Sequence, residues 1–316
     1  MVFKTLRPLR LGSGSLQRNK KIFNSLPAMV FLIAWIFCGC APQQNNLLKE
    51  LPGPETMTGD ELERSGDVYF RQGNLQMALV RYNKFLRLNP DNTRVRYKKG
   101  LIFLKGKMND KAVREFEKII EKEPEHKFAY QGLGQAFFEL KKYKEAEKHL
   151  RKAVELKPKL WKAHNLLGII YDYKKDYKAA VTEYKAAIVL KPDNALIYNN
   201  LGVSYSLAGG YEQAIHTFED ALKITTSYPK IYNNLGLVLA RLGKDRRAMA
   251  AFRKGGDKAQ AYNNLGFVYL QRGEREPAIR SFEKAIECKP AFYLRAGENL
   301  KKTEMEDLYD SSKKSD

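Results

Sequence analysis

Small residues recur along this chain at a fixed spacing, and that spacing restricts the fold more than any other feature. Six glycines follow one another in steps of 34 residues, six alanines follow them 12 residues later, and a seventh pair comes after a step of 30. The glycines are Gly66, Gly100, Gly134, Gly168, Gly202, Gly236 and Gly266, and the alanines are Ala78, Ala112, Ala146, Ala180, Ala214, Ala248 and Ala278. A unit of this length cannot bury its apolar face alone, so its stability comes from stacking on its neighbours.

Each unit has the composition of two helices of about 12–14 residues joined by a turn. A glycine inside a helix costs roughly 0.5–1 kcal/mol relative to alanine, so something in each unit must need the missing side chain. We expect the glycine of the first helix to face the alanine of the second, so that the two axes approach closely. Proline ends five of the units, because it cannot continue a helix.

This pattern resembles the tetratricopeptide repeat (TPR). The resemblance implies an all-α, right-handed superhelical solenoid of about seven helix–turn–helix repeats plus a C-terminal cap helix. We place the TPR domain at residues 59–292, the cap helix at 293–303 and a polar tail at 304–316. The units are 59–92, 93–126, 127–160, 161–194, 195–228, 229–258 and 259–292.

The sixth unit is four residues short, which is about one helical turn. Its second helix runs into Lys254-Gly255-Gly256-Asp257 where other units have a longer apolar stretch and a proline. Two interpretations stay open. The sequence has drifted at a junction between units that tolerates change, or the junction forms a local bend that changes the direction of the last unit.

The N-terminus has the features of an export signal. Residues 1–21 hold six Lys or Arg and no acid, an apolar run follows at 28–37, and Gly39-Cys40 comes next. The run is too short to cross a bilayer core of about 30 Å as a stable helix. The segment resembles a bacterial lipoprotein signal peptide, residues 1–39, removed before Cys40. An uncleaved anchor, or a protein released after cleavage, are the alternatives.

The lipoprotein resemblance implies acyl chains such as palmitate on Cys40, the lipid attachment residue, and several such chains hold a protein firmly on a bilayer. Residues 40–58 then form a lipidated tether. The expected location is the cell envelope, facing the periplasm, and Ala41 after the lipid cysteine favours the outer membrane. We expect Cys288, on an apolar helix, to be a small core residue.

The chain carries 56 basic and 36 acidic side chains, a formal net charge of +20. Many of the lysines lie within residues 141–191, interspersed with acids. A solvated helix face explains this pattern, and attraction to anionic headgroups, cell-wall polymer or an acidic partner is the alternative. No nucleic-acid module is visible, so we expect no nucleic-acid partner.

The sequence shows no catalytic constellation. The four histidines are scattered without metal-ligand spacing on one helix face, and no phosphate-binding glycine loop or nucleophile elbow occurs. We therefore expect no enzyme activity, no metal, no cofactor and no small-molecule substrate.

In TPR proteins, positions 2, 5, 6, 9, 12 and 13 of the first helix line a concave groove. Asparagine occupies position 5 of four units and position 6 of three, so the resemblance implies a ladder of amides that can bind the backbone of an extended peptide. The residues are Asn165, Asn199, Asn233 and Asn263 at position 5, and Asn200, Asn234 and Asn264 at position 6. The alternative is that these amides bond within the protein.

Aromatic residues at other groove positions, Phe128, Phe138 and Tyr173, predict that part of the groove takes an apolar segment. A different mode, the clamp for a C-terminal carboxylate, needs Lys at position 5 and Asn at position 9. The first unit has Glu63 and Asp67 there. We therefore expect a protein or extended-peptide partner in the groove, but no carboxylate clamp.

These features predict a non-catalytic protein–protein interaction scaffold anchored to the bacterial envelope. Its layout resembles TPR lipoproteins of tight-adherence (Flp-type) pilus assembly, which implies an assembly factor for a pilus or secretion system. The alternative is an envelope adaptor that recruits cell-wall enzymes, outer-membrane assembly machinery or exopolysaccharide export machinery. A third hypothesis, an enzyme or regulatory subunit acting on cell-wall polymer, has no support in the residue content.

Overall fold

The computed structural model describes residues 57–289, 296–301 and 303, and all regular structure in these ranges is helical. Fourteen longer helices lie in this part of the chain, and a shorter helical stretch follows, described at 296–301 and 303. They are α1 (Gly59–Arg71), α2 (Leu75–Leu88), α3 (Thr93–Lys105), α4 (Asn109–Lys122), α5 (Lys127–Glu139), α6 (Tyr143–Leu156), α7 (Trp161–Tyr173), α8 (Tyr177–Leu190), α9 (Ala195–Leu207), α10 (Tyr211–Ile224), α11 (Pro229–Arg241), α12 (Asp245–Gly255), α13 (Lys258–Gln271) and α14 (Arg275–Cys288).

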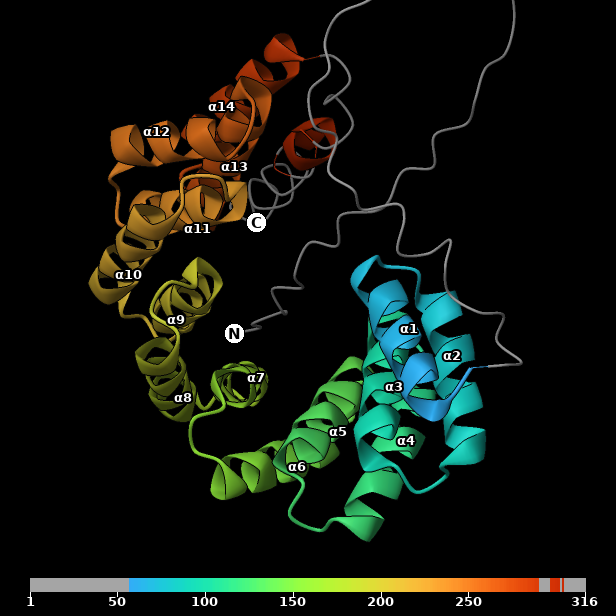
Figure 1. Cartoon of the computed structure of the whole chain (residues 1–316). Coiled ribbons are helices and arrows are strands. Elements are labelled where there is room, and N and C mark those ends of the chain that lie inside the picture. The colour runs from blue at the N-terminus through green and yellow to red at the C-terminus, as the bar shows by residue number, and fades with distance from the viewer. Residues whose placement is uncertain (1–56, 290–295, 302, 304–316) are drawn as a thin grey trace, which may run out of the picture. The chain divides into compact units, whose positions relative to one another are not determined.

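The helices come in pairs, each joined by a tight turn, as the sequence predicts (Figure 1). One residue of each turn has a positive φ. Glycine fills this place in four turns, as at Gly73 with φ 78°, and lysine fills it in three: Lys107, Lys141 and Lys175. Glycine adopts this left-handed conformation without steric cost, whereas lysine does so at a cost of roughly 1 kcal/mol.

The two helices of a pair approach closely at the repeated glycine, but the residue that this glycine contacts is not the one we expected. A Cβ on Gly66 would lie 2.4 Å from the ring of Tyr82, and one on Gly202 would lie 2.6 Å from the ring of Phe218. The glycine therefore makes room for the large side chain at position 24 rather than for the alanine at position 20. Tyr82 and Phe218 are fully buried, so this contact forms the centre of each unit's core.

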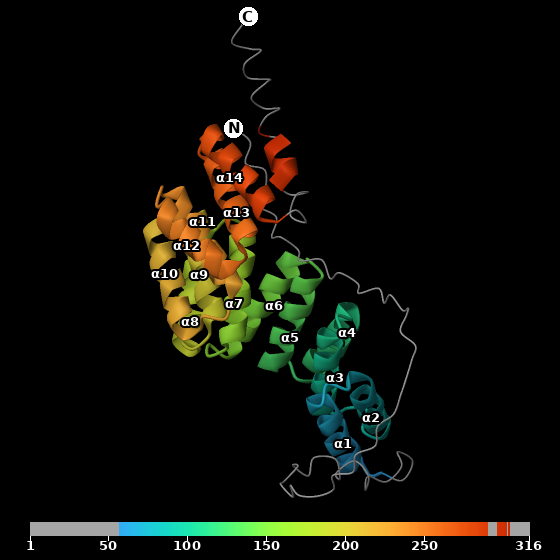
Figure 2. The same cartoon turned by 90° about the horizontal axis from the view of Figure 1, so that it is seen from above.

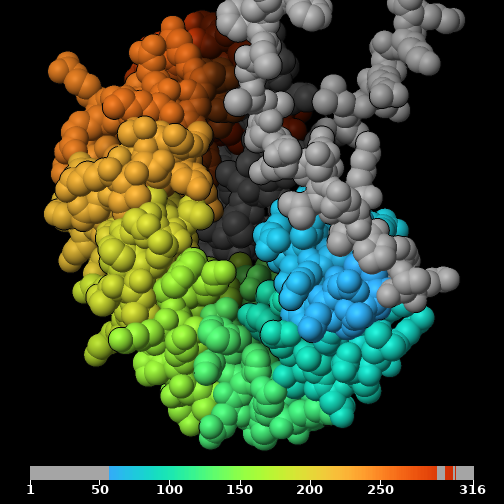
Figure 3. All heavy atoms as spheres, in the orientation of Figure 1, coloured from blue at the N-terminus to red at the C-terminus, as the bar shows by residue number. Residues whose placement is uncertain are grey.

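Successive pairs stack on one another. The second helix of each pair contacts the first helix of the next, from α2 on α3 to α12 on α13. The buried clusters follow the same order along the chain, each shared between neighbouring pairs. The turned view and the space-filling view show the pairs following one another in chain order (Figures 2 and 3). This arrangement is the TPR solenoid predicted from the sequence.

The shortened sixth unit appears in the structure as a shortened second helix. α12 has 11 residues, whereas α2, α4, α6, α8, α10 and α14 have 14 each. Only Gly256 and Asp257 separate α12 from α13. The second helix of the sixth unit and the linker after it are therefore the two parts that are shorter than in the other units.

One prediction is wrong: Cys288 is exposed, not a core residue. The buried stripe of α14 ends at Ala285, and Cys288 is the last residue of the helix, beyond its packed portion. The predicted signal peptide 1–39, Cys40 and nearly all of the tether lie outside the described residues, as does the polar tail. The predicted boundaries of the units stay predictions.

Candidate functional site

The asparagines predicted to line the groove bond to one another between units. Asn165 Oδ1 accepts a hydrogen bond from Asn200 Nδ2 at 3.1 Å, and Asn199 Oδ1 accepts one from Asn234 Nδ2 at 2.8 Å. Each bond joins position 5 of one unit to position 6 of the next, 35 residues later. We call these bonds the amide rungs.

Burial differs along the rungs. Asn199 is buried, with 2 % of its surface exposed, whereas the other six predicted asparagines are half-buried. A buried amide oxygen without a partner costs about 1–3 kcal/mol, so the rungs stabilise the stacking of neighbouring units. A role in ligand binding for these asparagines stays a prediction.

The rungs are interrupted at the shortened unit. Asn233 Nδ2 donates to the carbonyl oxygen of Gly255, the last residue of α12, at 3.0 Å. The Asn233 side chain lies close to the backbone of Gly255, since a Cβ on Gly255 would lie 2.5 Å from Asn233 Oδ1. Asn264, the position 6 residue of the next unit, makes no side-chain hydrogen bond with any residue in the described ranges.

A rung reappears at the end of the described chain. Asn299 Nδ2, in the helical stretch described at 296–301 and 303, donates to Asn263 Oδ1 at 3.0 Å. Ala296 and Thr303 of this stretch are buried. The short helix therefore contacts unit seven through the same kind of bond that joins full units.

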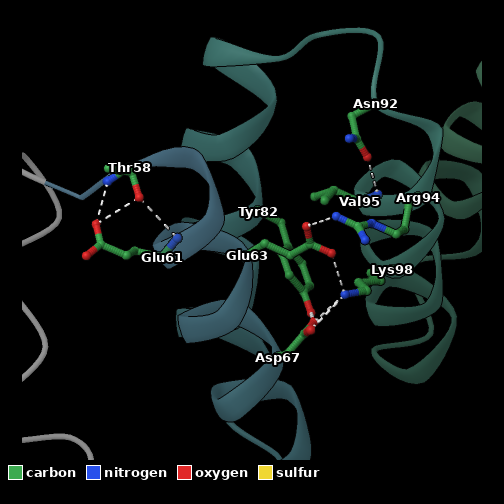
Figure 4. Close-up of polar contacts among 9 residues, drawn as sticks. All are labelled: Thr58, Glu61, Glu63, Asp67, Tyr82, Asn92, Arg94, Val95 and Lys98. Atoms are coloured by element: carbon green, nitrogen blue, oxygen red, sulfur yellow. Dashed lines mark hydrogen bonds and ion pairs between the residues drawn. The ribbon is translucent and has the colours of Figure 1, made fainter.

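At the other end of the array, charged residues occupy the same place. Lys98, at position 6 of the second unit, donates to Glu63 Oε1, at position 5 of the first, at 2.7 Å. Lys98 also contacts both oxygens of Asp67, at 2.8 and 2.7 Å, and Arg94 donates to Glu63 Oε2 at 2.5 Å. Figure 4 shows these side chains of α1 and α3 pointing toward one another. We call Glu63, Asp67, Arg94 and Lys98 the charged rung.

Tyr82 extends this cluster into the core. Its hydroxyl donates to Asp67 Oδ1 at 2.5 Å (Figure 4). Burial raises the pKa of Tyr82 above its ordinary value, and the hydrogen bond to Asp67 raises it further. Tyr82 therefore stays a neutral hydrogen-bond donor. The charged rung was not predicted from the sequence, although the 35-residue spacing of Glu63 and Lys98 is a signal for it.

Unit four contains a related pair. Tyr184 donates its hydroxyl proton to Asp172 Oδ2 at 2.8 Å. Burial raises the pKa of Asp172, although the hydrogen bond it accepts from Tyr184 acts in the opposite direction. The other carboxylate oxygen of Asp172 is buried without a hydrogen-bond partner in the described structure.

The three predicted aromatic groove residues lie in two groups. Phe138 and Tyr173 have ring centres 6.3 Å apart, and Tyr173 stacks on Tyr143 at 4.9 Å. Phe128 lies with Tyr97, at 6.3 Å, and beneath the Lys157 ammonium, at 5.0 Å. Of the three predicted residues, Tyr173 is the most accessible, with 52 % of its surface exposed, whereas the other two are half-buried.

Two exposed apolar side chains lie at position 9 of the last two units. Leu237 is 39 % exposed and Phe267 is 40 % exposed. Each follows a position 6 asparagine, Asn234 or Asn264, by three residues and therefore lies one turn further along the same helix face. Large apolar side chains prefer burial, so this pair offers a contact surface.

A small open cavity lies at another place, where the linkers after α8 and α10 meet. It has a volume of about 270 Å³, and the exposed side chains of Leu196, Ile224 and Tyr228 line part of it. Lys191 and Asp193 form an ion pair at its edge, with Nζ and Oδ2 2.8 Å apart.

Within the described ranges, no three His, Cys, Asp or Glu side chains are grouped so that they could hold a metal ion. In those same ranges, every helix is too short or too polar to cross a bilayer.

Three family models match the repeat region. A model described as "TPR repeat" matches residues 66–106, 173–209 and 205–243. Two described as "Tetratricopeptide repeat" match residues 128–160 and 259–292, and residues 94–126. Together these matches extend over more than half of the chain. A search of the curated proteins finds no match.

Solved structures share the fold. A tetratricopeptide repeat protein from Parabacteroides merdae is 18 % identical with a TM-score of 0.56, and the match covers 78 % of this chain and 98 % of that one. PilF of Pseudomonas aeruginosa is 20 % identical with a TM-score of 0.52, and the match covers 65 % of this chain and 95 % of that one. At these identities the likeness extends to the fold alone.

Proposed function

Because the chain belongs to the tetratricopeptide-repeat proteins, which generally act as non-catalytic scaffolds for protein–protein interaction, we propose that it is an envelope-anchored assembly factor for a pilus or secretion system. Its repeats bind a protein or peptide partner, and lipid on Cys40 holds it on the membrane, facing the periplasm. The observation that carries the binding role is the stacked array of helix pairs, which presents exposed apolar residues such as Leu237 and Phe267 beside amide side chains.

The N-terminal sequence supports the anchoring part of the proposal. A basic segment, a short apolar run and Gly39-Cys40 resemble a lipoprotein-type signal, and residues 41–58 are long enough to act as a tether between the lipid and α1. Lipid on Cys40 would also remove a thiol that could form unwanted disulfides outside the cell.

Metabolic labelling with an alkyne analogue of palmitate tests the anchor. We expect label on the wild type in the membrane fraction, and loss of both label and membrane association in Cys40→Ser. Cys288→Ser is the matched control, because Cys288 is the exposed thiol of the described chain and should leave labelling unchanged. Label that persists in Cys40→Ser would disprove the lipidation site.

Purification from membranes in mild detergent tests the assembly role. Double substitution of Leu237 and Phe267 by Ser removes the exposed apolar pair, and Val189→Ser, at a side chain that is 80 % exposed on α8, is the control. Secretin or pilus proteins that co-purify with wild type and control but not with the double variant would support the proposal. Cell-wall enzymes in their place, together with normal pili in a deletion strain, would favour the envelope-adaptor alternative.

A further inference from the structure

One charged side chain of the first unit is buried without a counter-charge in the described structure. Arg81, on α2, has 6 % of its surface exposed. Its Nε and Nη1 atoms are buried, and neither has a hydrogen-bond partner in the described part of the chain. The hydroxyl oxygen of Ser65, on α1, is also buried and also lacks a partner there. A buried donor that stays unpaired costs free energy, and a buried charge costs more, so Arg81 requires a partner.

The repeat indicates that Ser65 and Arg81 lie opposite each other. They occupy positions 7 and 23 of unit one, and the residues at these positions in unit two, Lys99 and Glu115, form an ion pair with Nζ and Oε1 2.9 Å apart. The guanidinium carbon of Arg81 also lies 5.9 Å from the ring centre of Tyr69, which follows Ser65 by one turn on α1. The guanidinium and the hydroxyl therefore belong to one buried polar site.

Position 23 carries a paired charge in two other units. In unit two, Glu115 accepts a hydrogen bond from Arg96, at position 4, at 3.0 Å. In unit four, an oxygen of Glu183 lies 2.6 Å from Nδ1 of His164, again at position 4. Unit one has the opposite arrangement, because its position 23 is a base and its position 4 is the apolar Leu62. The site of unit one therefore lacks a carboxylate.

The acids of the first two helices do not supply this carboxylate. α2 contains no Asp or Glu. On α1, Glu61 accepts from Thr58, and Glu63 and Asp67 belong to the charged rung. Asp60, the remaining acid of α1, is exposed in the first turn. A carboxylate from outside the described residues would supply the counter-charge.

The chain that enters a unit passes beside this site. In unit two, Arg96 also donates to the carbonyl oxygen of Pro90, six residues earlier in the chain, and unit four repeats this contact between the equivalent residues. In unit one, Met57 lies five residues before Leu62, and both side chains are buried in one apolar cluster. A polypeptide segment at this end of the array is therefore well placed to reach the guanidinium.

We propose that Arg81 and Ser65 form a binding site for an acidic side chain of a polypeptide segment that lies against the first unit. A carboxylate accepts two parallel hydrogen bonds from a guanidinium, and Nε or Nη1 supplies one of them. The Ser65 hydroxyl offers a further donor. Positions 7 and 23 are not groove positions, so the site is separate from the contact surface of Leu237 and Phe267. It is equally distinct from the carboxylate clamp, which uses positions 5 and 9.

Two sources have this chemistry. Residues 41–56 contain two acids, Glu50 and Glu55. Glu55 is two residues from Met57, a span of at most about 7 Å in an extended chain, so its carboxylate is within reach. This source would join the predicted tether to the first unit. The other source is an acidic segment of a separate polypeptide, for which this end of the array would be a docking point.

Hydrogen exchange of the full-length protein in detergent tests the site. The variant to compare carries Glu50→Gln and Glu55→Gln, and the probe is the peptide acetyl-tetraglutamate. At about ten times its dissociation constant, the peptide should raise the protection of the α1 and α2 amides about tenfold by mass action. The response should disappear when Arg81→Met is added. It should persist with Arg87→Met, the matched control, because Arg87 is an exposed base on the same helix.

Single substitutions identify the source. We expect Glu55→Gln alone to lower the protection of α1 and α2 about tenfold, and to cause no further loss in Arg81→Met, as for two groups in direct contact. Glu50→Gln is the matched control, because it makes the same charge change five residues further from α1. Unchanged protection in Glu55→Gln, with a response of the wild type to tetraglutamate, would assign the site to a separate polypeptide.

Two results would overturn the site. One is a double Gln variant that does not respond to tetraglutamate, and the other is an equal response with and without Arg81. Sodium chloride at equal ionic strength separates binding from screening. Either result together with normal co-purification of secretion or pilus proteins would leave the proposed function standing, because its tested surface lies on α11 and α13.

Discussion

The first and fifth units of this protein join their successors at the same place with different chemistry. Glu63 and Lys98 are bridged by charge at 2.7 Å, whereas Asn199 and Asn234 are bridged by neutral amides at 2.8 Å. Both pairs connect position 5 to position 6 of the next unit, 35 residues away. The stacking of units therefore sets the geometry of this contact, and the sequence at two positions decides its chemistry.

The two chemistries have different requirements. The charged rung needs several partners, because Glu63 is buried and accepts from both Arg94 and Lys98, while Asp67 accepts from Lys98 and Tyr82. The amide rung needs one bond, because an amide carries no net charge whose desolvation must be compensated. The charged end should therefore be more sensitive to single substitutions and to salt than the amide end.

The largest effect is expected from Lys98→Met. The substitution keeps the length of the side chain but leaves Glu63 and Asp67 facing each other with only Arg94 as a cation, so we expect a loss of about 2–3 kcal/mol in the free energy of unfolding of the first unit. Because repeats unfold locally, hydrogen exchange of the α1 and α2 amides is the appropriate measurement. Unchanged protection of these amides would show that the charged rung contributes nothing to stacking.

A smaller effect is expected from Asn234→Ala. It leaves the buried oxygen of Asn199 without its donor, which should cost about 1–2 kcal/mol in the protection of α9 and α11. Added salt tests the difference between the charged rung and the amide rung. We expect 0.5 M NaCl to lower the hydrogen-exchange protection of α1 to α3 and to leave that of α9 to α11 unchanged. An equal response of both regions would mean that charge and amide rungs are energetically alike.

The smallest effect concerns His164, at the start of the amide-paired region. Its Nδ1 lies 2.6 Å from Glu183 Oε2 and its Nε2 lies 2.9 Å from the carbonyl oxygen of Pro158, so the ring satisfies both acceptors only as an imidazolium. The hydrogen bond to Glu183 raises the pKa of His164 above 6.5, and the Pro158 carbonyl adds to this, although burial opposes it.

Because the folded pKa of His164 is raised, its stabilising contribution is complete below pH 6.5 and disappears as the pH rises through the folded value. We expect the protection of α7 to fall modestly between pH 6 and pH 9 in the wild type, and this fall to be absent in His164→Gln. The Asn199–Asn234 rung has no titrating group, so it supplies the internal reference. A fall of the same size in His164→Gln would assign the pH dependence to another group.

The helix pairs were predictable because their signal lies within single units. Gly66 and Tyr82 belong to one pair, and a glycine inside a helix indicates a close approach even though the sequence suggested the wrong partner for it. The shortened sixth unit was visible in the spacing, but its consequence for Asn233 was not, because that depends on where the end of α12 lies relative to α11.

The rungs themselves were harder to predict because each joins two units. Asparagine at positions 5 and 6 fits both a ligand ladder and internal bonding, and only the arrangement of neighbouring first helices shows that Asn199 meets Asn234. The same arrangement brings Lys98 to Glu63, a pair that the TPR pattern does not mark. Cys288 was misassigned because the pattern of apolar residues continues past the point at which α14 stops packing.

Each rung joins position 5 of one unit to position 6 of the next. Units can therefore be exchanged only where the residues at these two positions are able to pair. Deleting residues 195–228 would place Asn165 one unit before Asn234, and the same amide bond could form across the new junction. Joining the first unit directly to the fifth would instead set the carboxylate of Glu63 against the neutral amide of Asn200, with Lys98 and Arg94 gone. Duplication or loss of whole units can therefore change the length of the array within the amide-paired region, whereas the first unit accepts one neighbour only.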